Sequence, residues 1–359
     1  IKTKSKIYPI YFGDKILGSI GRIINKKIQN IKKIVIIADN KIPPFFLKKL
    51  IFSLKKYNTK IYKITANEKA KSFKTANKLI ERILKDNLNR SDCIISFGGG
   101  VVSDLSSFIS SLVKRGIKFV NIPTTLLAQV DASIGGKTGV NSFQGKNLIG
   151  TFYQPDFILI DTSLLKSLPQ REMICGYGEI LKHSIIKNRN TFNYLKNNYS
   201  KILNLKSPFI EKAIAESCKI KKSIVEKDEK EKNLRKVLNF GHTFAHSFEA
   251  SLKYSKKLNH GEAVLMGIKC AVKFSQKINY IPKNDAEKII KHIDSLKTKN
   301  LKDFFKLKDL EKIIKFIKID KKNKTKKINL ILLKKIGKTD INSNYNVNTV
   351  KKFLYDELK

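Results

Sequence analysis

The chain has 359 residues, of which 73 are Lys or Arg and 30 are Asp or Glu, so its formal net charge at pH 7 is +43. Hydrophobic residues make up 42% of the chain, which argues against a disordered basic tail. At one domain per ~150 residues, the length predicts about two domains.

A charge of this size suggests nucleic acid or an anionic membrane as partner. The lysines, however, are spread along the whole chain, and the densest run, 318–327, is short and lies between apolar segments. A nucleic-acid arm concentrates its charge in a patch or a tail. We therefore expect most lysines to line solvated helix faces, and we expect no nucleic-acid partner.

Membrane, secreted and disulfide-bonded classes are also disfavoured. No stretch approaches ~18 uninterrupted apolar residues, and the basic segment 1–13 is not followed by the apolar run of a secretory signal. The four cysteines contain no C-x-x-C pair, which favours free, mostly buried thiols in a reducing compartment. We expect a soluble cytoplasmic protein with no membrane partner.

Strand and helix patterns alternate in the N-terminal part of the chain. Strands are predicted at 31–40, 59–67, 91–100 and 117–125, and helices at 45–57 and 73–88. This alternation predicts an α/β fold with a parallel sheet and covering helices. From about residue 170 the pattern becomes helical, with few strand signals. We therefore expect an α/β domain at 1–165 and an α-helical domain at 166–359.

Strand 91–100 runs into Gly98, Gly99 and Gly100, which precede a helical pattern. Glycine lets the backbone approach a phosphate closely, and the free amides of a helix N-terminus favour an anion. The segment matches neither G-x-G-x-x-G nor the Walker A motif. It is therefore either a tight structural turn or, at the end of a parallel strand, part of a ligand site.

Segment 123–150 gathers polar side chains between glycines. Two of its lysines, Lys137 and Lys146, directly follow a glycine. In an anion-binding loop, glycine shapes the backbone while lysine supplies charge. The alternative is an ordinary solvated loop.

A metal site is indicated in the helical half. His242 and His246 lie four residues apart on one helix face, His260 follows at an apparent helix start, and Glu179 and His183 lie upstream. Two imidazoles and a carboxylate with an open position are typical of a catalytic Zn²⁺ or similar site. The sequence HTFAH lacks the Glu of H-E-x-x-H, which excludes a zinc protease of that type. Spacing alone does not choose among the histidines, and a structural histidine pair stays an alternative.

With these motifs in view, the chain resembles the 3-dehydroquinate synthases. The resemblance runs from about Asp39 to beyond Lys322 and rests on separated motifs in order: GGGVVSDL, RGIKFVNIPTTLLAQVDASIGGKTGVN, GKNLIG, FYQP, LPQRE, GEILK, LRKVLNFGHTFAHSFE and HGEAV. It implies a Rossmann-like nucleotide-binding α/β domain followed by an α-helical metal-binding domain. It also implies NAD⁺ and a divalent metal, Zn or Co, as cofactors.

Carried over position by position, the resemblance assigns the metal to Glu179, His242 and His260. The implied NAD⁺ contacts are Asp39, Glu68, Lys71, Gly99, Gly100, Val101, Val102, Ser103, Asp104, Thr124, Thr125, Lys137 and Lys146. The implied catalytic groups are Asp131, Lys137, Lys182, Arg235, Asn239 and His246. Further substrate contacts would be Asn147, Lys221, one of Lys321 and Lys322, and Arg115, which resembles an arginine that reaches a neighbouring subunit's site and so implies a homodimer.

The implied reaction converts 3-deoxy-D-arabino-heptulosonate 7-phosphate to 3-dehydroquinate and phosphate, in the shikimate route to aromatic compounds. NAD⁺ takes a hydride and later returns it, so the reaction has no net redox change. The protein mainly binds, orients and supplies charge. A substrate that carries a phosphate and a carboxylate demands several cations, which Lys137, Lys221, Arg235 and His246 could supply.

The chain departs from the family pattern at three positions. Ser103 and Ser107 stand where the family usually has glycine, and Gly178 stands where alanine is common. If residue 103 needs a positive φ, serine is costly there; otherwise we expect its hydroxyl to add a phosphate hydrogen bond.

Three other functions remain as alternatives. A sister sugar-phosphate cyclase would act on another sugar phosphate, and a metal-dependent polyol or alcohol dehydrogenase would release NADH. Charge alone also allows a nucleic-acid binder. The cations expected for the substrate carboxylate, Lys221 and Arg235, favour the dehydroquinate reaction.

Overall fold

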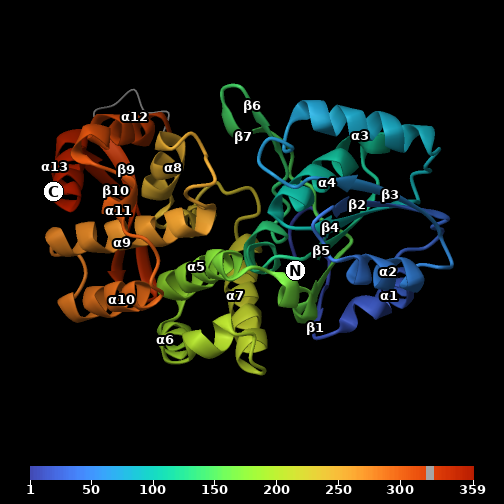
Figure 1. Cartoon of the computed structure of the whole chain (residues 1–359), viewed down its shortest axis with the longest axis horizontal. Helices are drawn as coiled ribbons and strands as arrows, with labels where there is room; N and C mark the ends of the chain where they lie inside the picture. Colours follow the sequence, from blue (N-terminus) through green and yellow to red (C-terminus); the bar gives the residue numbers. More distant parts are fainter. Residues whose placement is uncertain (321–326) are drawn as a thin grey trace. The chain divides into compact units, whose positions relative to one another are not determined.

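The computed structural model describes residues 1–320 and 327–359, and the chain divides into two compact units (Figure 1). Unit 1 contains Ile1–Met173 and Leu205–Lys230, and unit 2 contains Ile174–Asn204 and Glu231–Lys359. The single boundary expected between residues 165 and 166 is not the boundary of these two units. The reason is α7 (Phe209–Val225), which packs on the turn Ala128–Ala132 within unit 1. The assignment of 1–165 and 166–359 to separate functions stays a prediction.

Unit 1 is built on a six-stranded parallel sheet. In spatial order its strands are β1 (Ile10–Gly13), β8 (Phe157–Asp161), β5 (Lys118–Pro123), β4 (Cys93–Gly98), β2 (Lys33–Asp39) and β3 (Asn58–Ile64). The four predicted strands are confirmed as β2 to β5. The sequence analysis did not identify β1 and β8, which pair with each other in parallel across a long sequence separation.

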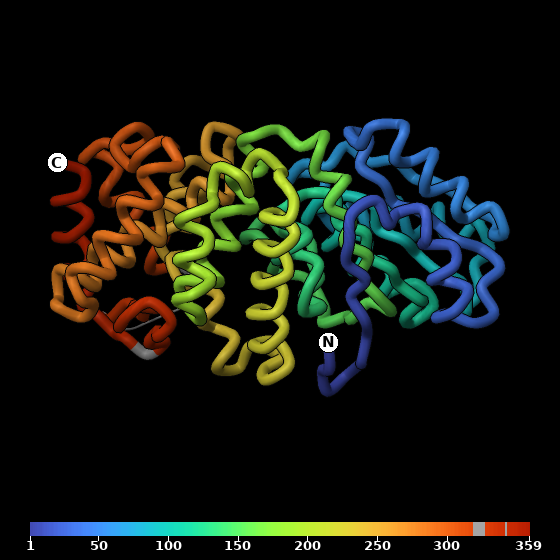
Figure 2. Tube along the Cα trace, turned by 90° about the horizontal axis from the view of Figure 1, so that it is seen from below, coloured from blue at the N-terminus to red at the C-terminus, as the bar shows by residue number. Residues whose placement is uncertain are grey.

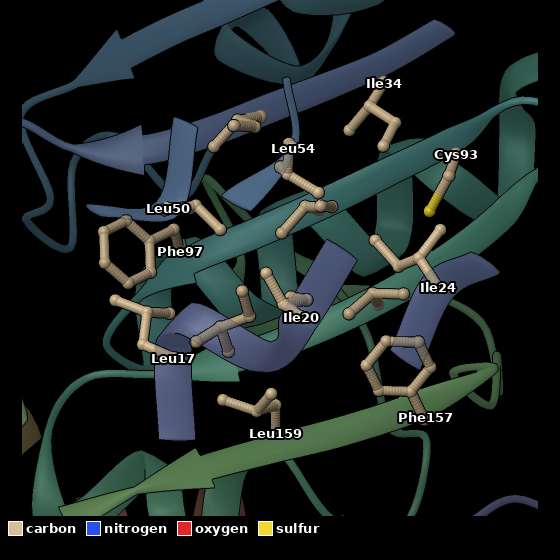
Figure 3. Close-up of a cluster of buried hydrophobic side chains, with 14 of the residues drawn as sticks. Leu17, Ile20, Ile24, Ile34, Leu50, Leu54, Cys93, Phe97, Phe157 and Leu159 are labelled. Carbon is tan, nitrogen blue, oxygen red and sulfur yellow. The ribbon is translucent and has the colours of Figure 1, made fainter. Parts of the chain in front are cut away.

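Helices cover both faces of this sheet (Figure 1). On one face lie α1 (Ile20–Lys27) and α2 (Pro44–Ser53), and on the other lie α3 (Phe73–Lys85) and α4 (Gly100–Leu112). Strand β2 shows why: Ile34 packs with Ile20, Ile24, Leu50 and Leu54 of α1, α2 and the residue after α2 (Figure 3), as does Ile36. Val35 and Ile37 pack on the other face with α3 and α4. Successive side chains point to opposite faces, so a continuous apolar strand needs cover on both.

The strand order of unit 1 creates a site for a ligand. From β2 the chain moves outward to β3, then returns to the opposite side of β2 to form β4, and continues to β5. The point where the order reverses lies between β2 and β4, at their carboxyl ends. Open α/β sheets bind ligands at such switch points.

Unit 2 is mainly helical, as predicted. Its helices are the part of α5 (Gln170–Lys187) from residue 174, α6 (Arg189–Leu203), α8 (His242–Ser251), α9 (His260–Lys277), α10 (Lys283–Ser295), α11 (Leu301–Phe304), α12 (Leu310–Asp320) and α13 (Val347–Leu358). The trace in Figure 2 follows α6 into α7, consecutive helices that belong to different units.

An antiparallel hairpin in unit 2 was not predicted. Its strands are β9 (Lys327–Lys335) and β10 (Lys338–Asn346), and β9 packs against α9. The four cysteines are free, and three of them are buried, as expected. Within residues 1–320 and 327–359, no helix combines the length and apolarity needed to cross a bilayer.

Candidate functional site

The turn between β4 and α4 lies at the switch point of unit 1. Gly99 caps α4 with an extended backbone, and a Cβ there would lie 2.9 Å from Cγ2 of Thr125. The backbone N–H of Thr124 donates to the carbonyl of Gly98 at 2.9 Å. The ends of β2, β4 and β5 therefore bring the predicted NAD⁺ residues Asp39, 99–104, Thr124 and Thr125 to one edge of the sheet. Free amides at a helix N-terminus and a side-chain-free backbone suit a pyrophosphate group.

A buried lysine joins two of the predicted segments. Lys71, which precedes α3, forms an ion pair with Asp104 in α4 and donates to Oδ1 of Asn147 at 2.5 Å. Burial raises the pKa of Asp104, while the charge of Lys71 acts in the opposite direction. The predicted NAD⁺ contacts Lys71 and Asp104 thus lie beside the predicted substrate contact Asn147.

The same region is held together through Asn141, which the sequence analysis did not identify. Its side-chain amide donates to Oε1 of Glu68 at 2.7 Å, and its Oδ1 accepts from the backbone N–H of Asn147 at 3.0 Å. Lys146 lies 3.9 Å from Oε1 of Glu68. Asn141 ends up here because β6 (Val140–Ser142) and β7 (Gly145–Ile149) form a hairpin beside the start of α3.

Helix α7 brings a second predicted pair together in unit 1. The ammonium group of Lys221 lies 2.6 Å from Oδ1 of Asp131 and also donates to the Asp131 backbone carbonyl. Asp131 belongs to a single π-helical turn, a feature frequent at functional sites. The backbone of Lys137 pairs with that of Phe152 in an isolated antiparallel β-bridge. Arg115 lies just after the end of α4 and has a φ of 62°.

In unit 2, three helices bring the predicted metal ligands together. Glu179 lies on α5, while His242 and His260 are the first residues of α8 and α9. Each offers a donor atom, and the three atoms lie within 4.8 Å of one another. Oε1 of Glu179 is 3.5 Å from Nε2 of His242 and 3.7 Å from Nε2 of His260. Two imidazoles and one carboxylate form a donor set that suits Zn²⁺ or Co²⁺.

The second nitrogen of each imidazole is also held. Nδ1 of His242 lies 3.2 Å from the carbonyl of Phe240, and Nδ1 of His260 lies 3.2 Å from Oε2 of Glu249. In the neutral imidazoles these acceptors keep the proton on Nδ1, which leaves the two Nε2 atoms, the ones near Glu179, as the donors for a metal ion. This arrangement is typical of histidines that bind metal.

Charge differs between the two histidines. Burial, assisted by the positive charge of Lys182, lowers the pKa of His242 well below its usual value. Burial would also lower the pKa of His260, but the carboxylates of Glu249 and Glu179 outweigh it and raise that pKa to about 10. A negative environment that favours a proton also favours a divalent cation, because the two compete for the same nitrogen.

Close contacts between α5, α8 and α9 set the spacing of the three candidate metal ligands. A Cβ on Gly261, next to His260, would fall on the backbone of Cys175 in α5, far inside van der Waals contact. Gly241, which caps α8 at φ 78°, would place a Cβ 2.7 Å from the backbone nitrogen of Ile268 in α9. A capping box between Asn259 and Glu262 starts α9 at His260. The glycines let helices α5, α8 and α9 approach closely enough for their ligands to meet.

Two of the predicted catalytic residues of unit 2, Lys182 and His246, lie next to this group. Lys182 is buried and forms an ion pair with Glu179 one turn earlier on α5. The ring of His246 lies 5.3 Å from that of His242. Asn239, in the turn Leu234–Asn239 that also carries Arg235, donates to Oε1 of Glu231 at 2.8 Å.

Several outcomes differ from, or lie beyond, the sequence analysis. Ser103 lies inside α4 with a helical backbone and donates to Oδ1 of Asn121 at 3.0 Å, so its backbone is unstrained and its hydroxyl proton is already used. The sequence analysis missed Glu231 and Glu249. Their partners are Asn239 and His260, and sequence spacing does not reveal which segments pack together. Lys321 and Lys322 lie outside the described residues.

Comparisons with known proteins cover nearly the whole chain. Residues 61–175 match the family model "3-dehydroquinate synthase N-terminal", and residues 176–323 match "3-dehydroquinate synthase C-terminal". A curated 3-dehydroquinate synthase from Pelagibacter ubique (strain HTCC1062) is 49% identical over 359 residues, covering 100% of this chain and 98% of that protein. Another, from Thermoanaerobacter sp. (strain X514), is 41% identical and covers 95% of each.

Solved structures share the fold at lower identity. A 2-deoxy-scyllo-inosose synthase complexed with carbaglucose-6-phosphate, NAD⁺ and Co²⁺ aligns with a TM-score of 0.87 at 24% identity, over 97% of this chain and 96% of that one. A 2-epi-5-epi-valiolone synthase from Streptomyces hygroscopicus subsp. jinggangensis 5008, with NAD⁺ and Zn²⁺ bound, gives 0.88 at 22%, over 99% and 98%. An iron-containing alcohol dehydrogenase from Thermotoga maritima gives 0.69 at 17%, over 98% of each chain.

Proposed function

Because the chain belongs to the 3-dehydroquinate synthase family, we propose that it converts 3-deoxy-D-arabino-heptulosonate 7-phosphate to 3-dehydroquinate and phosphate. It would act in the shikimate route to aromatic compounds. The observation that carries this proposal is the full-length match, at 49% identity, to a curated synthase. The solved sugar cyclases and alcohol dehydrogenase, all below 25% identity, show the shared fold and do not bear on the substrate.

Glu179, His242 and His260 would hold the divalent metal. Their donor atoms are close enough to share one ion, and Nδ1 of each imidazole faces an acceptor. A bound Zn²⁺ or Co²⁺ would polarise a substrate hydroxyl. Zn²⁺ and Co²⁺ occur in the solved structures of similar fold, which supports either ion here.

Unit 1 would bind NAD⁺ at its switch point, and this cofactor would take and return a hydride. The turn after Gly98 and the first turn of α4 suit the pyrophosphate, and Asp39 ends the neighbouring strand β2. Lys71 would hold the region through Asp104 and Asn147.

The remaining polar residues would bind and orient the substrate. Lys221 and Arg235 are buried, positively charged side chains that suit a carboxylate or phosphate. Asp131 holds Lys221, and Glu231 holds Asn239, so both contacts are preorganised. Lys137, Lys182 and His246 would complete the polar groups that face the substrate.

We further propose that the enzyme is a homodimer in which Arg115 reaches the partner's site. The support is a set of exposed apolar side chains at the end of α4, on the β6–β7 hairpin and just after it: Leu112, Phe143, Leu148, Ile149 and Phe152. The segment after β7 is tied to α4, close in sequence to Arg115, by a hydrogen bond between the hydroxyls of Thr151 and Ser111 at 3.0 Å. Exposed apolar clusters mark interaction sites. The free thiols are consistent with a cytoplasmic location.

The experiment is an activity assay with the heptulosonate phosphate, NAD⁺ and Zn²⁺ or Co²⁺. We expect equal amounts of phosphate and 3-dehydroquinate, loss of both with a chelator, and recovery when metal is restored. Metal-independent activity would contradict the metal assignment. Failure to form 3-dehydroquinate, with turnover of the sugar phosphate of a sister cyclase instead, would contradict the substrate assignment.

A further inference from the structure

The two histidines of the candidate metal site are held by acceptors of different charge. Nδ1 of His242 faces a neutral backbone carbonyl, that of Phe240, at 3.2 Å. Nδ1 of His260 faces the carboxylate of Glu249, also at 3.2 Å. We propose that Glu249 is a positioning residue that orients His260 and strengthens it as a metal ligand without binding the ion itself. This inference rests on the metal site of the proposed function.

The helix geometry explains how Glu249 reaches His260. Glu249 follows His242 by seven residues on α8, two helical turns along the same face. That face packs on α9, which begins at His260. One helix thus supplies the ligand His242 at its start and, two turns later, the acceptor that holds the ligand from the next helix.

The acceptor defines which nitrogen of His260 is available. An ionised carboxylate only accepts hydrogen bonds, so the proton of a neutral His260 lies on Nδ1. The lone pair then lies on Nε2, which faces Oε1 of Glu179 at 3.7 Å. Without Glu249 the ring could rotate or take the other tautomer, and either change would remove the donor.

The negative charge of Glu249 adds a second effect. Lys182 already pairs with the carboxylate of Glu179, so the positive charge of a divalent ion is only partly balanced by its ligands. Glu249 is buried and lies next to the imidazole, where its charge makes Nε2 more electron-rich. His260 should therefore be the stronger of the two imidazole donors.

The test measures metal affinity rather than turnover. Full-length metal-free protein is titrated with Zn²⁺ against a competing chelator, and the absorption spectrum of the Co²⁺ form is recorded. The variants are Glu249→Ala, which removes the acceptor, and Glu249→Gln. The glutamine keeps the size of the side chain and offers an amide oxygen as acceptor, but it lacks the negative charge. Asp285→Asn is the matched control, because Asp285 is a buried acid of unit 2 that pairs with Arg189 instead.

We expect Glu249→Ala to weaken Zn²⁺ binding about 10- to 100-fold, Glu249→Gln to weaken it less, and both to shift the Co²⁺ spectrum. Asp285→Asn should bind Zn²⁺ like the unchanged protein. If Glu249→Ala does not fold, as judged by circular dichroism, the Gln variant decides. Unchanged affinity and an unchanged Co²⁺ spectrum in the folded variants would overturn the proposal.

One further variant distinguishes a wrong role for Glu249 from a wrong metal site. Glu179→Gln should abolish tight Zn²⁺ binding if Glu179 is a ligand. If Glu179→Gln binds as tightly as the unchanged protein, the metal site itself is wrong and the role of Glu249 falls with it. If only the Glu249 variants bind normally, the metal site stands and the positioning role is wrong.

Discussion

Glu179 and Lys182 form an ion pair one turn apart on α5, and both side chains are almost fully buried. Taking a charge out of water is costly, so each group depends on nearby opposite charge. In the proposed metal site, Glu179 is shared between Lys182 and the ion. The charge balance of the site therefore depends on whether metal is bound.

Replacing Lys182 with Met should destabilise the protein in a metal-dependent way. Losing one partner of a buried pair costs about 3–5 kcal/mol, because the other charge is left without compensation. Zn²⁺ would supply part of the missing positive charge, so we expect a smaller loss in the loaded protein. Urea unfolding with and without Zn²⁺ measures both losses, and equal losses would contradict this account.

A second prediction concerns Ser103, one of the predicted NAD⁺ contacts. Its hydroxyl donates to Asn121 inside unit 1, and its backbone is helical. Ser103→Gly removes a buried hydrogen bond, worth about 1 kcal/mol, and adds a helical glycine, so the free energy of unfolding should fall by about 1–2 kcal/mol. NAD⁺ affinity, measured by calorimetry, should stay within about twofold. A large loss of affinity would mean that the hydroxyl binds the cofactor.

At the scale of elements, unit 2 depends on how closely its helices approach. The three proposed ligands lie on three different helices, so their spacing is a property of packing and not of any one helix. Two glycines on the α5–α9 contact differ in what a methyl group would meet. A Cβ on Gly261 would lie 2.2 Å from the backbone of Cys175, whereas a Cβ on Gly178 would lie 3.2 Å from the flexible side chain of Leu265 and 3.3 Å from the carbonyl oxygen of Gly261.

This difference makes Gly261→Ala and Gly178→Ala a matched pair. Alanine is normally favoured over glycine in a helix by about 1 kcal/mol. Gly178→Ala should therefore cost little, since Leu265 can adjust and the carbonyl of Gly261 must give by only a few tenths of an ångström. Gly261→Ala must separate α5 from α9, and we expect a loss of about 3 kcal/mol or more together with loss of Zn²⁺ binding. Chemical unfolding and metal content measure these effects, and equal behaviour of the two variants would contradict the packing argument.

An acid-sensitive contact joins three further elements of unit 2. Asp285 on α10 pairs with Arg189 of α6 and accepts from the backbone N–H of Ile336, just after β9. Burial alone would raise the pKa of Asp285, but Arg189 and the backbone donor outweigh it and lower that pKa. The stabilisation is therefore present above the unfolded-state pKa of about 3.9 and is lost as pH falls through the lower folded-state pKa.

Comparing the native protein with Asp285→Asn tests this contact. The variant should be less stable at pH 7, and the difference should shrink at acidic pH as the native carboxylate takes up a proton. Thermal unfolding across pH gives the curve. A stability difference that grew toward acid would show that the carboxylate is not stabilised by its charge.

At the scale of the molecule, the sequence predicted most of the sheet and the identity of the candidate ligands. The strands β2 to β5 were visible because buried parallel strands are continuous apolar runs. Spacing could not choose among four histidines, because the ligands come from separate helices. Glu249 was invisible for the same reason, since its partner lies on α9 and the contact exists only after α8 and α9 pack.

The net charge of +43 gave less information than its size suggests. Few of the 73 cations belong to the candidate sites, and those act through short contacts such as Lys71 with Asp104 and Lys221 with Asp131. The others set the field of the surface, which attracts small anions weakly.

The proposed dimer predicts recovery of activity between two inactive variants. Arg115→Ala would remove a group from the partner's site, and His242→Ala would disable its own site. Co-expressed, half of randomly formed dimers are mixed, and each mixed dimer has one intact site of two, so about a quarter of native activity should return. Sedimentation should show a dimer. A mixture as inactive as its components would contradict the shared site.

The most direct test of the central claim is the number of products formed per NAD⁺. Protein carrying one NAD⁺ per site is mixed with excess 3-deoxy-D-arabino-heptulosonate 7-phosphate and Zn²⁺, and phosphate, 3-dehydroquinate and NADH are followed together. We predict many molecules of phosphate and 3-dehydroquinate per NAD⁺, with no accumulation of NADH, because the hydride returns in each cycle. NADH formed in proportion to substrate consumed would contradict the synthase assignment and indicate a dehydrogenase.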